Sequence, residues 1–216
     1  MAIERPGRPE DLPAAELLWA RWALLGALET TAAKESSRRD SGHWLDEDGL
    51  RYDDCGCTWW TLAPFGPGRY VLYGEDESSG VKWHEPAVDM LAGGPDWLPY
   101  ETLHELRESW QLGCVYWYED GAWARAPYPA TLADDGLDCG MSELADRDRL
   151  LSLLADFEHL RSAEGAALLL DGAERRALAR DEVETTLAPA YAPEDAAAVV
   201  RALEASGLLA VTAPAV

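Results

Sequence analysis

The stretch CVYWYEDGAWARA, residues 114–126, sets two aromatic runs on either side of Asp120-Gly121. An Asp-Gly pair between β-prone runs is typical of a two-residue hairpin turn, because both residues accept the positive φ angles that such a turn requires. The stretch therefore predicts an antiparallel hairpin.

The same turn also predicts the register of the hairpin. Counting outward from it sets Tyr118 opposite Trp123 and Trp117 opposite Ala124. An aromatic pair beside the turn is a cross-strand contact of the kind that holds two strands in one register. We expect this hairpin to belong to an antiparallel sheet.

Further strand and loop signals lie upstream. The β-like run CTWWTL (57–62) and the run RYVLY (69–73) flank a Gly/Pro turn at 63–68, which predicts a second hairpin. The Asp/Gly-rich segment 40–54 is expected to be a loop, and VKWHE (81–85) a third strand. Cys55, Cys57 and Trp59 would then share one face of a strand.

Helical patterns occupy both ends of the chain. Leucines and tryptophans recur at helical spacing over residues 17–28, and Asp11 could cap the start of this helix. A short helix is expected at 101–110, with Leu103, Leu106 and Trp110 on its apolar face and Gly113 as its left-handed stop. Three further helices are expected over about 143–160, 173–187 and 194–206, and LLAVTA (208–213) could form a short strand.

Aromatic composition divides the chain. Eight of the ten tryptophans lie between residues 40 and 128, and the sequence becomes rich in Ala and Leu from about 131. We therefore expect a first domain at 1–130, with an N-terminal helix and a Trp-rich α+β part, and a helical subdomain at 131–216. The predicted fold class is α+β: an N-terminal helix, a Trp-rich antiparallel sheet with a short helix, then an all-helical part.

Charge restricts the classes of partner. The chain has 40 acidic and 18 basic residues and a net charge of −22. Such a charge opposes approach to nucleic-acid phosphates or to an anionic membrane surface. We expect no nucleic-acid or membrane partner, and we expect the acidity to favour a basic protein, a cationic ligand or solubility.

The sequence also predicts a cytoplasmic location. No segment reaches the roughly 18–20 apolar residues that span a bilayer, and the longest candidate, 17–28, contains Arg21. Glu10, Asp11 and Glu16 fit a signal peptide poorly. In a reducing compartment the four cysteines would be thiols or metal ligands.

Cys55-Gly-Cys57 has three interpretations. The two thiols could bind zinc together with His84 and Cys114, as a small metal-dependent hydrolase or a metal-stabilised domain. A second closely spaced ligand pair is missing, which weakens that interpretation. A redox pair is disfavoured because Asp53 and Asp54 would raise the thiol pKa. The third interpretation is two small buried residues in a strand, without a cofactor.

Catalytic motifs with a recognisable spacing are absent from the sequence. It contains no G-x-S-x-G nucleophile turn, Walker loop or G-x-G-x-x-G stretch. Forty acids make any single pair of carboxylates an unspecific candidate. The sequence therefore favours a non-enzymatic protein and leaves an enzymatic function open.

Acidic and aromatic residues alternate in three stretches, HWLDEDGLRYDDCGCTWW, YGEDESSGVKWHE and VYWYEDGAW. Tryptophan and tyrosine anchor interfaces, and carboxylates at the rim steer a basic partner. We expect a non-enzymatic binding protein of the immunity or antidote kind. Its expected partner-binding residues are Trp59, Trp60, Glu75, Asp76, Glu77, Trp83 and Trp123.

Two alternatives use the same apolar features. The aromatic side chains could instead stack on sugar rings, which would make the chain a sugar- or small-ligand-binding module. The apolar stripe of the N-terminal helix could also pair with a second copy of the chain in a homodimer.

Overall fold

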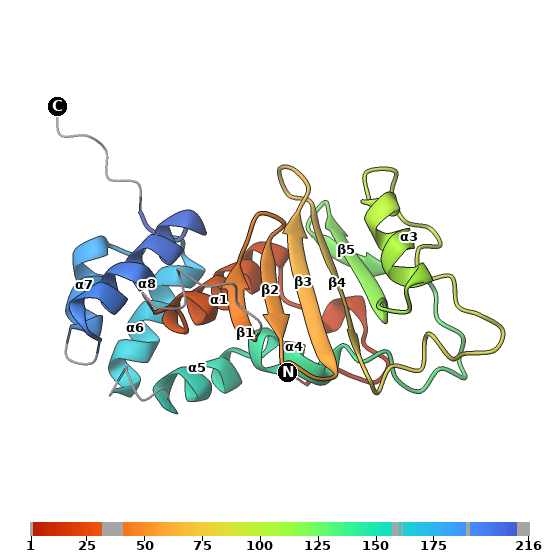
Figure 1. Cartoon of the computed structure of the whole chain (residues 1–216), viewed down its shortest axis with the longest axis horizontal. Coiled ribbons are helices and arrows are strands. Elements are labelled where there is room, and N and C mark those ends of the chain that lie inside the picture. The colour runs from red at the N-terminus through yellow and green to blue at the C-terminus, as the bar shows by residue number, and fades with distance from the viewer. Residues whose placement is uncertain (1, 32–40, 157–159, 161, 189–190, 211–216) are drawn as a thin grey trace.

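The computed structural model describes residues 2–31, 41–156, 160, 162–188 and 191–210. Its α+β architecture matches the predicted fold class: an N-terminal helix, a six-stranded antiparallel sheet with a short helix, and five helices after the sheet. Figure 1 shows the C-terminal helices on one side of the sheet and the short helix on the other.

The sheet is a meander in which each strand pairs with its neighbours in the sequence. The predicted hairpin is confirmed, since Tyr118 pairs with Trp123 and Trp117 with Ala124. Asp120 (φ 53°) and Gly121 (φ 81°) form its turn. The strands are β1 Gly42–Leu45, β2 Leu50–Asp53, β3 Thr58–Pro64, β4 Tyr70–Asp76, β5 Cys114–Glu119 and β6 Ala122–Arg125.

Two local predictions about the sheet are wrong. The expected loop at 40–54 contains β1 and β2, because Asp46 accepts the backbone N–H groups of Asp48 and Gly49 and so builds a tight turn. The expected strand at 81–85 is a series of turns. Both edges of β4 are already paired, with β3 and β5, so no edge of that strand was left for a further partner.

Helix α1 (Ala15–Leu28) lies between the sheet and the C-terminal helices and is buried on nearly every side. It begins later than predicted. Asp11 belongs to a preceding 3-10 turn, Pro9–Asp11, and accepts N–H groups of Glu4 and Arg8 instead of capping α1. The chain itself covers most of the apolar surface of this helix, through which the homodimer was expected to form.

Two of the three expected C-terminal helices are interrupted. The helix predicted at 143–160 is divided in two, with a break at Asp146. The helix predicted at 173–187 is confirmed over Arg180–Leu187 and wrong before it, because the preceding helix ends at Glu174 and the chain turns at Arg176 (φ 50°). The helix predicted at 194–206 is confirmed. Leu209 bridges Leu178, while residues 211–213 of the expected short strand lie outside the described residues. The helices are α4 Asp138–Ala145, α5 Arg147–Asp156, α6 Ala163–Glu174, α7 Arg180–Leu187 and α8 Pro193–Ala205.

The two faces of the sheet belong to different apolar cores. One face, with Trp60 and Leu62, packs with α1 and the C-terminal helices into a core shared by residues on both sides of position 130. The other face, with Val71 and Trp117, is covered by α3 (Tyr100–Glu108) and by the long connection from β4 (Figure 1). No helix among the described residues has the length and apolarity to cross a membrane.

Candidate functional site

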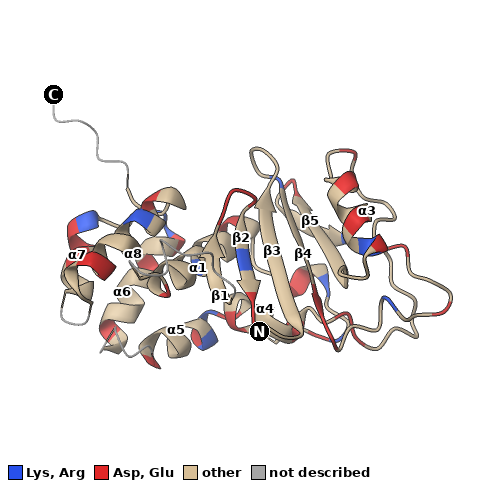
Figure 2. Ribbon diagram, viewed as in Figure 1, with Lys and Arg blue, Asp and Glu red and all other residues tan. Residues whose placement is uncertain are grey.

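Three acidic segments meet at the end of the sheet where β3 begins and β4 ends. The hydroxyl of Thr58, at the start of β3, donates to the carboxylate of Asp76, at the end of β4, at 2.6 Å. The Gly80 N–H donates to the Asp134 carbonyl at 3.0 Å, which adds the segment before α4. Figure 2 shows acidic residues where β2 and β4 end. We name this region the acidic end; it comprises Asp53, Asp54, Glu75, Asp76, Glu77, Asp134 and Asp138.

Asp54 organises the turn that carries the two thiols. Its Oδ1 accepts the backbone N–H groups of Gly56, Cys57 and Thr58 at 2.8, 3.0 and 3.1 Å. These bonds, the one from Thr58 first, lower the pKa of Asp54, because they favour the ionised carboxylate. The exposed turn therefore presents a charged acid at neutral pH.

Asp76 supports the acidic end from inside. Its carboxylate is buried and accepts the Thr58 hydroxyl at 2.6 Å and the Ser78 N–H at 2.9 Å. Burial acts to raise the pKa of Asp76, but the hydrogen bonds from Ser78 and Thr58 outweigh it and the pKa is lowered. Asp76 was expected to face a partner; it instead joins the first residue of β3 to the loop after β4.

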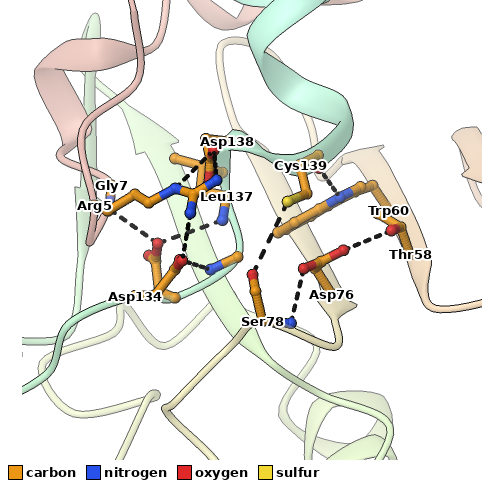
Figure 3. A network of polar contacts seen from close by, with 12 residues as sticks. Arg5, Gly7, Thr58, Trp60, Asp76, Ser78, Asp134, Leu137, Asp138 and Cys139 are labelled. Carbon is orange, nitrogen blue, oxygen red and sulfur yellow. Dashed lines mark hydrogen bonds and ion pairs between the residues drawn. The ribbon is translucent and has the colours of Figure 1, made fainter.

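The N-terminal segment fastens the third acidic segment to this end. Arg5 contacts Asp138 at 2.6 Å and Asp134 at 3.4 Å, and the Trp60 indole N–H donates to the Cys139 carbonyl at 2.7 Å (Figure 3). These bonds join segments that are far apart in the sequence. Asp134 and Asp138 are thereby partly neutralised, which leaves the exposed acids of the other two segments to dominate the local charge.

Two exposed indoles lie in contact beside the acidic end. Trp83 and Trp110 are 69% and 58% exposed, and their ring centroids are 5.1 Å apart with an angle of 33° between the planes. Trp110 was expected on the buried face of its helix with Gly113 as the helix stop. The structure corrects both points, because Trp110 itself takes the left-handed position after α3, at φ 62°.

Lys82 connects this aromatic pair to the sheet. Its ammonium group contacts the Glu75 carboxylate and donates to the Trp110 carbonyl at 2.9 Å. Lys82 adjoins Trp83 in the sequence, so one side chain fixes the Trp83 turn against the end of α3. Glu75, expected as a steering acid, is therefore neutralised within the chain.

The other expected anchors have different environments. Trp60 is fully buried, and Trp123 is buried and donates to the Pro13 carbonyl at 2.6 Å, so neither can anchor a partner. Trp59 is half-buried and packs edge-on against Tyr73. Of the expected partner-binding residues, Trp83 and Glu77 are exposed. Trp110 was missed because its spacing from Leu103 and Leu106 fits a core position.

The four expected metal ligands are not brought together. Cys114 is fully buried, and that burial raises the pKa of its thiol. His84 instead contacts the Pro86 carbonyl at 2.9 Å and the Thr131 hydroxyl at 2.8 Å. Cys55 and Cys57 lie exposed in the turn and are therefore not buried in a strand. Across the described ranges no group of three His, Cys, Asp or Glu is placed to hold a metal.

A cavity of about 520 Å³ lies at the opposite end of the sheet, between the turns that join β3 to β4 and β5 to β6. Its lining includes Glu16, Arg69, Glu119 and one aromatic residue, Tyr118. The aromatic-lined cleft expected of a sugar-binding module would present several rings to the ligand, and this cavity presents one.

The backbone at Trp110 supports a first prediction. A side chain at φ 62° costs free energy that glycine avoids, so Trp110→Gly should be more stable to unfolding than Trp110→Ala by about 1 kcal/mol. Urea denaturation of the two variants measures this difference. Equal stability of the glycine and alanine variants would show that the left-handed conformation costs nothing here.

Three comparisons, with protein-family models, with curated proteins and with solved structures, find no match to this chain.

Proposed function

We propose that this chain is a non-enzymatic binding protein that engages a basic protein partner through the acidic end of its sheet. The exposed, mutually contacting indoles of Trp83 and Trp110 carry the proposal. Water-exposed tryptophans in contact are typical of interface anchors, which lose water when a partner covers them.

Electrostatics supports the choice of a basic partner. The net charge of −22 favours a cationic protein at long range. Asp54 and Glu77 are exposed at the acidic end, to which Lys82 joins the aromatic pair through its contact with Glu75. Carboxylates around an apolar anchor steer encounter and reject acidic competitors. An antidote that occludes a nuclease-type toxin would need such an acidic surface, because a protein that binds nucleic acid is itself cationic.

Strain at the anchor supports the same proposal. Trp110 occupies a left-handed position that glycine would fill with less strain. Unfavourable backbone conformations of this kind persist where the surrounding structure holds them, and they cluster at functional sites. Here Lys82, through its contacts with Glu75 and with the Trp110 carbonyl, holds Trp110 in this conformation.

Site-directed photo-crosslinking in the native host tests the proposal. A photoreactive residue at exposed Gln111, next to Trp110, is expected to trap one basic protein, and the same residue at exposed Leu168 on α6 is the control. Raising the salt in a lysate from about 0.05 to 0.5 M should lower the yield about tenfold, because salt screens exposed charges.

Two results would contradict the proposal. One is an acidic protein as the principal adduct at position 111. The other is the same adduct, in the same yield, from position 168.

A further inference from the structure

The open faces of the two indoles suggest what part of a partner they receive. With the ring centroids 5.1 Å apart, each indole covers part of the other, yet Trp83 and Trp110 remain 69% and 58% exposed. The angle of 33° between the planes leaves a tilted pair with accessible ring faces. An incoming group would therefore meet flat π surfaces.

Charge around the pair selects a cation for those surfaces. Glu85 and Glu108 are exposed and lie two residues along the chain from Trp83 and Trp110, respectively. Lys82 is already occupied by Glu75 and by the Trp110 carbonyl, and Arg107, three residues before Trp110, contacts Asp89 at 3.8 Å. A positive group on an indole face gains cation–π attraction, and neighbouring carboxylates add to it.

Among protein cations, the guanidinium group of arginine fits this surface better than the ammonium group of lysine. A guanidinium is planar, stacks on aromatic rings and is weakly hydrated, whereas an ammonium is a compact and strongly hydrated charge. We propose that the Trp83–Trp110 pair recognises an arginine side chain of the basic partner, by stacking of its guanidinium on an indole. This inference rests on the proposed function and specifies the recognised group.

Lys82 is a positioning residue in this scheme. Its bonds to Glu75 and to the Trp110 carbonyl set the turn that carries Trp83 against the end of α3 before any partner arrives. Rigid placement of this kind lowers the entropy lost on binding. The conservative variant Lys82→Arg should keep the charge pair.

Fluorescence anisotropy with two labelled peptides tests the proposal on the full chain. The probes are twelve-residue peptides of alternating Gly and Arg, or Gly and Lys, with the same charge. The Arg peptide should bind at least about 5-fold more tightly than the Lys peptide. Trp83→Ala and Trp110→Gly should each weaken the Arg peptide about 10-fold and bring the two affinities together.

Phe65→Ala provides the matched control, since Phe65 is an exposed aromatic residue in the turn between β3 and β4. This variant should keep the preference for the Arg peptide, and circular dichroism should show that all variants are folded. Equal affinity of the wild-type chain for both peptides, with salt-sensitive binding retained, would overturn arginine recognition while leaving the basic partner in place. Absence of binding to either peptide at low salt would contradict both proposals.

Discussion

Replacing Arg21 by alanine should lower the free energy of unfolding by about 3–5 kcal/mol, because it removes one partner from a buried charged network. The Arg21 side chain is 6% exposed in the middle of α1. Its Nε donates to Glu174 of α6 at 2.8 Å, and its Nη1 donates to the carbonyls of Leu144 and Ala145 at 3.1 and 2.7 Å. One guanidinium thus joins three helices.

Arg147 supplies the matched control for this loss. It contacts the same Glu174, at 3.1 Å, but its side chain is 36% exposed. Arg147→Ala should therefore cost less than about 1 kcal/mol, as exposed ion pairs do. Arg21→Lys should fall between the two alanine variants, because an ammonium cannot reproduce the fork of donors. Urea denaturation measures all three, and equal losses for Arg21→Ala and Arg147→Ala would contradict the argument.

Replacing Asp135 by alanine should cost about 3–5 kcal/mol, whereas Asp135→Asn at neutral pH should cost less than about 1 kcal/mol. Asp135 is buried, and its Oδ1 accepts the N–H groups of Gly7 at 2.9 Å and of Leu137 at 3.4 Å. Alanine would leave these buried donors without an acceptor. Asparagine keeps the acceptor oxygen in place.

The hydrogen bonds of Tyr116 are the reason to expect that asparagine is tolerated at position 135. The Tyr116 hydroxyl lies 2.8 Å from the Gly7 carbonyl and 2.6 Å from Asp135 Oδ2, yet it has one proton to donate. The hydroxyl therefore divides its proton between the Asp135 carboxylate and the Gly7 carbonyl. Burial raises the pKa of Asp135, although the hydrogen bond from Tyr116, the N–H groups of Gly7 and Leu137 and the charge of Arg125 act to lower it. In Asp135→Asn, the side-chain NH₂ group would donate to the Tyr116 oxygen while the Tyr116 hydroxyl donates to the Gly7 carbonyl.

The pH dependence of stability follows from the same shift. Because the pKa of Asp135 is higher in the folded state, the unfolded chain releases its proton first, and the contribution of Asp135 to stability falls as pH rises above about 4. The Asn variant has no such loss. In urea denaturation, the free energy of unfolding of the Asn variant relative to wild type should therefore rise between about pH 4 and 7. A difference between the two free energies that is independent of pH would show that Asp135 is ionised when folded.

Part of the fold was predictable because local chemistry decides it. Asp120-Gly121 fixes a turn by its φ angles, and the turn fixes the Tyr118–Trp123 register. The strand at 81–85 and the loop at 40–54 were mispredicted because strand formation depends on whether a partner edge is free. That condition is set by other segments of the chain.

The candidate site, too, was predictable only in part. The recurrence of acids and tryptophans indicated the surface type, and Trp83 and Glu77 are exposed as expected. Asp76 and Trp60 carry the same sequence signal but are buried, and Trp110, which fits a core position, is exposed. Spacing reports the side of an element on which a residue lies, and burial depends on what covers that side.

The sequence by itself determined the acidity of this protein, its central hairpin and the apolar character of its first helix, because charge, turn geometry and hydrophobicity belong to the residues. The tertiary structure alone decided that Arg21 is surrounded by protein, that three acidic segments meet at one end of the sheet, and that two tryptophans face water there. These properties arise only when distant segments pack together, since each depends on the neighbours that exclude water from a side chain or leave it open.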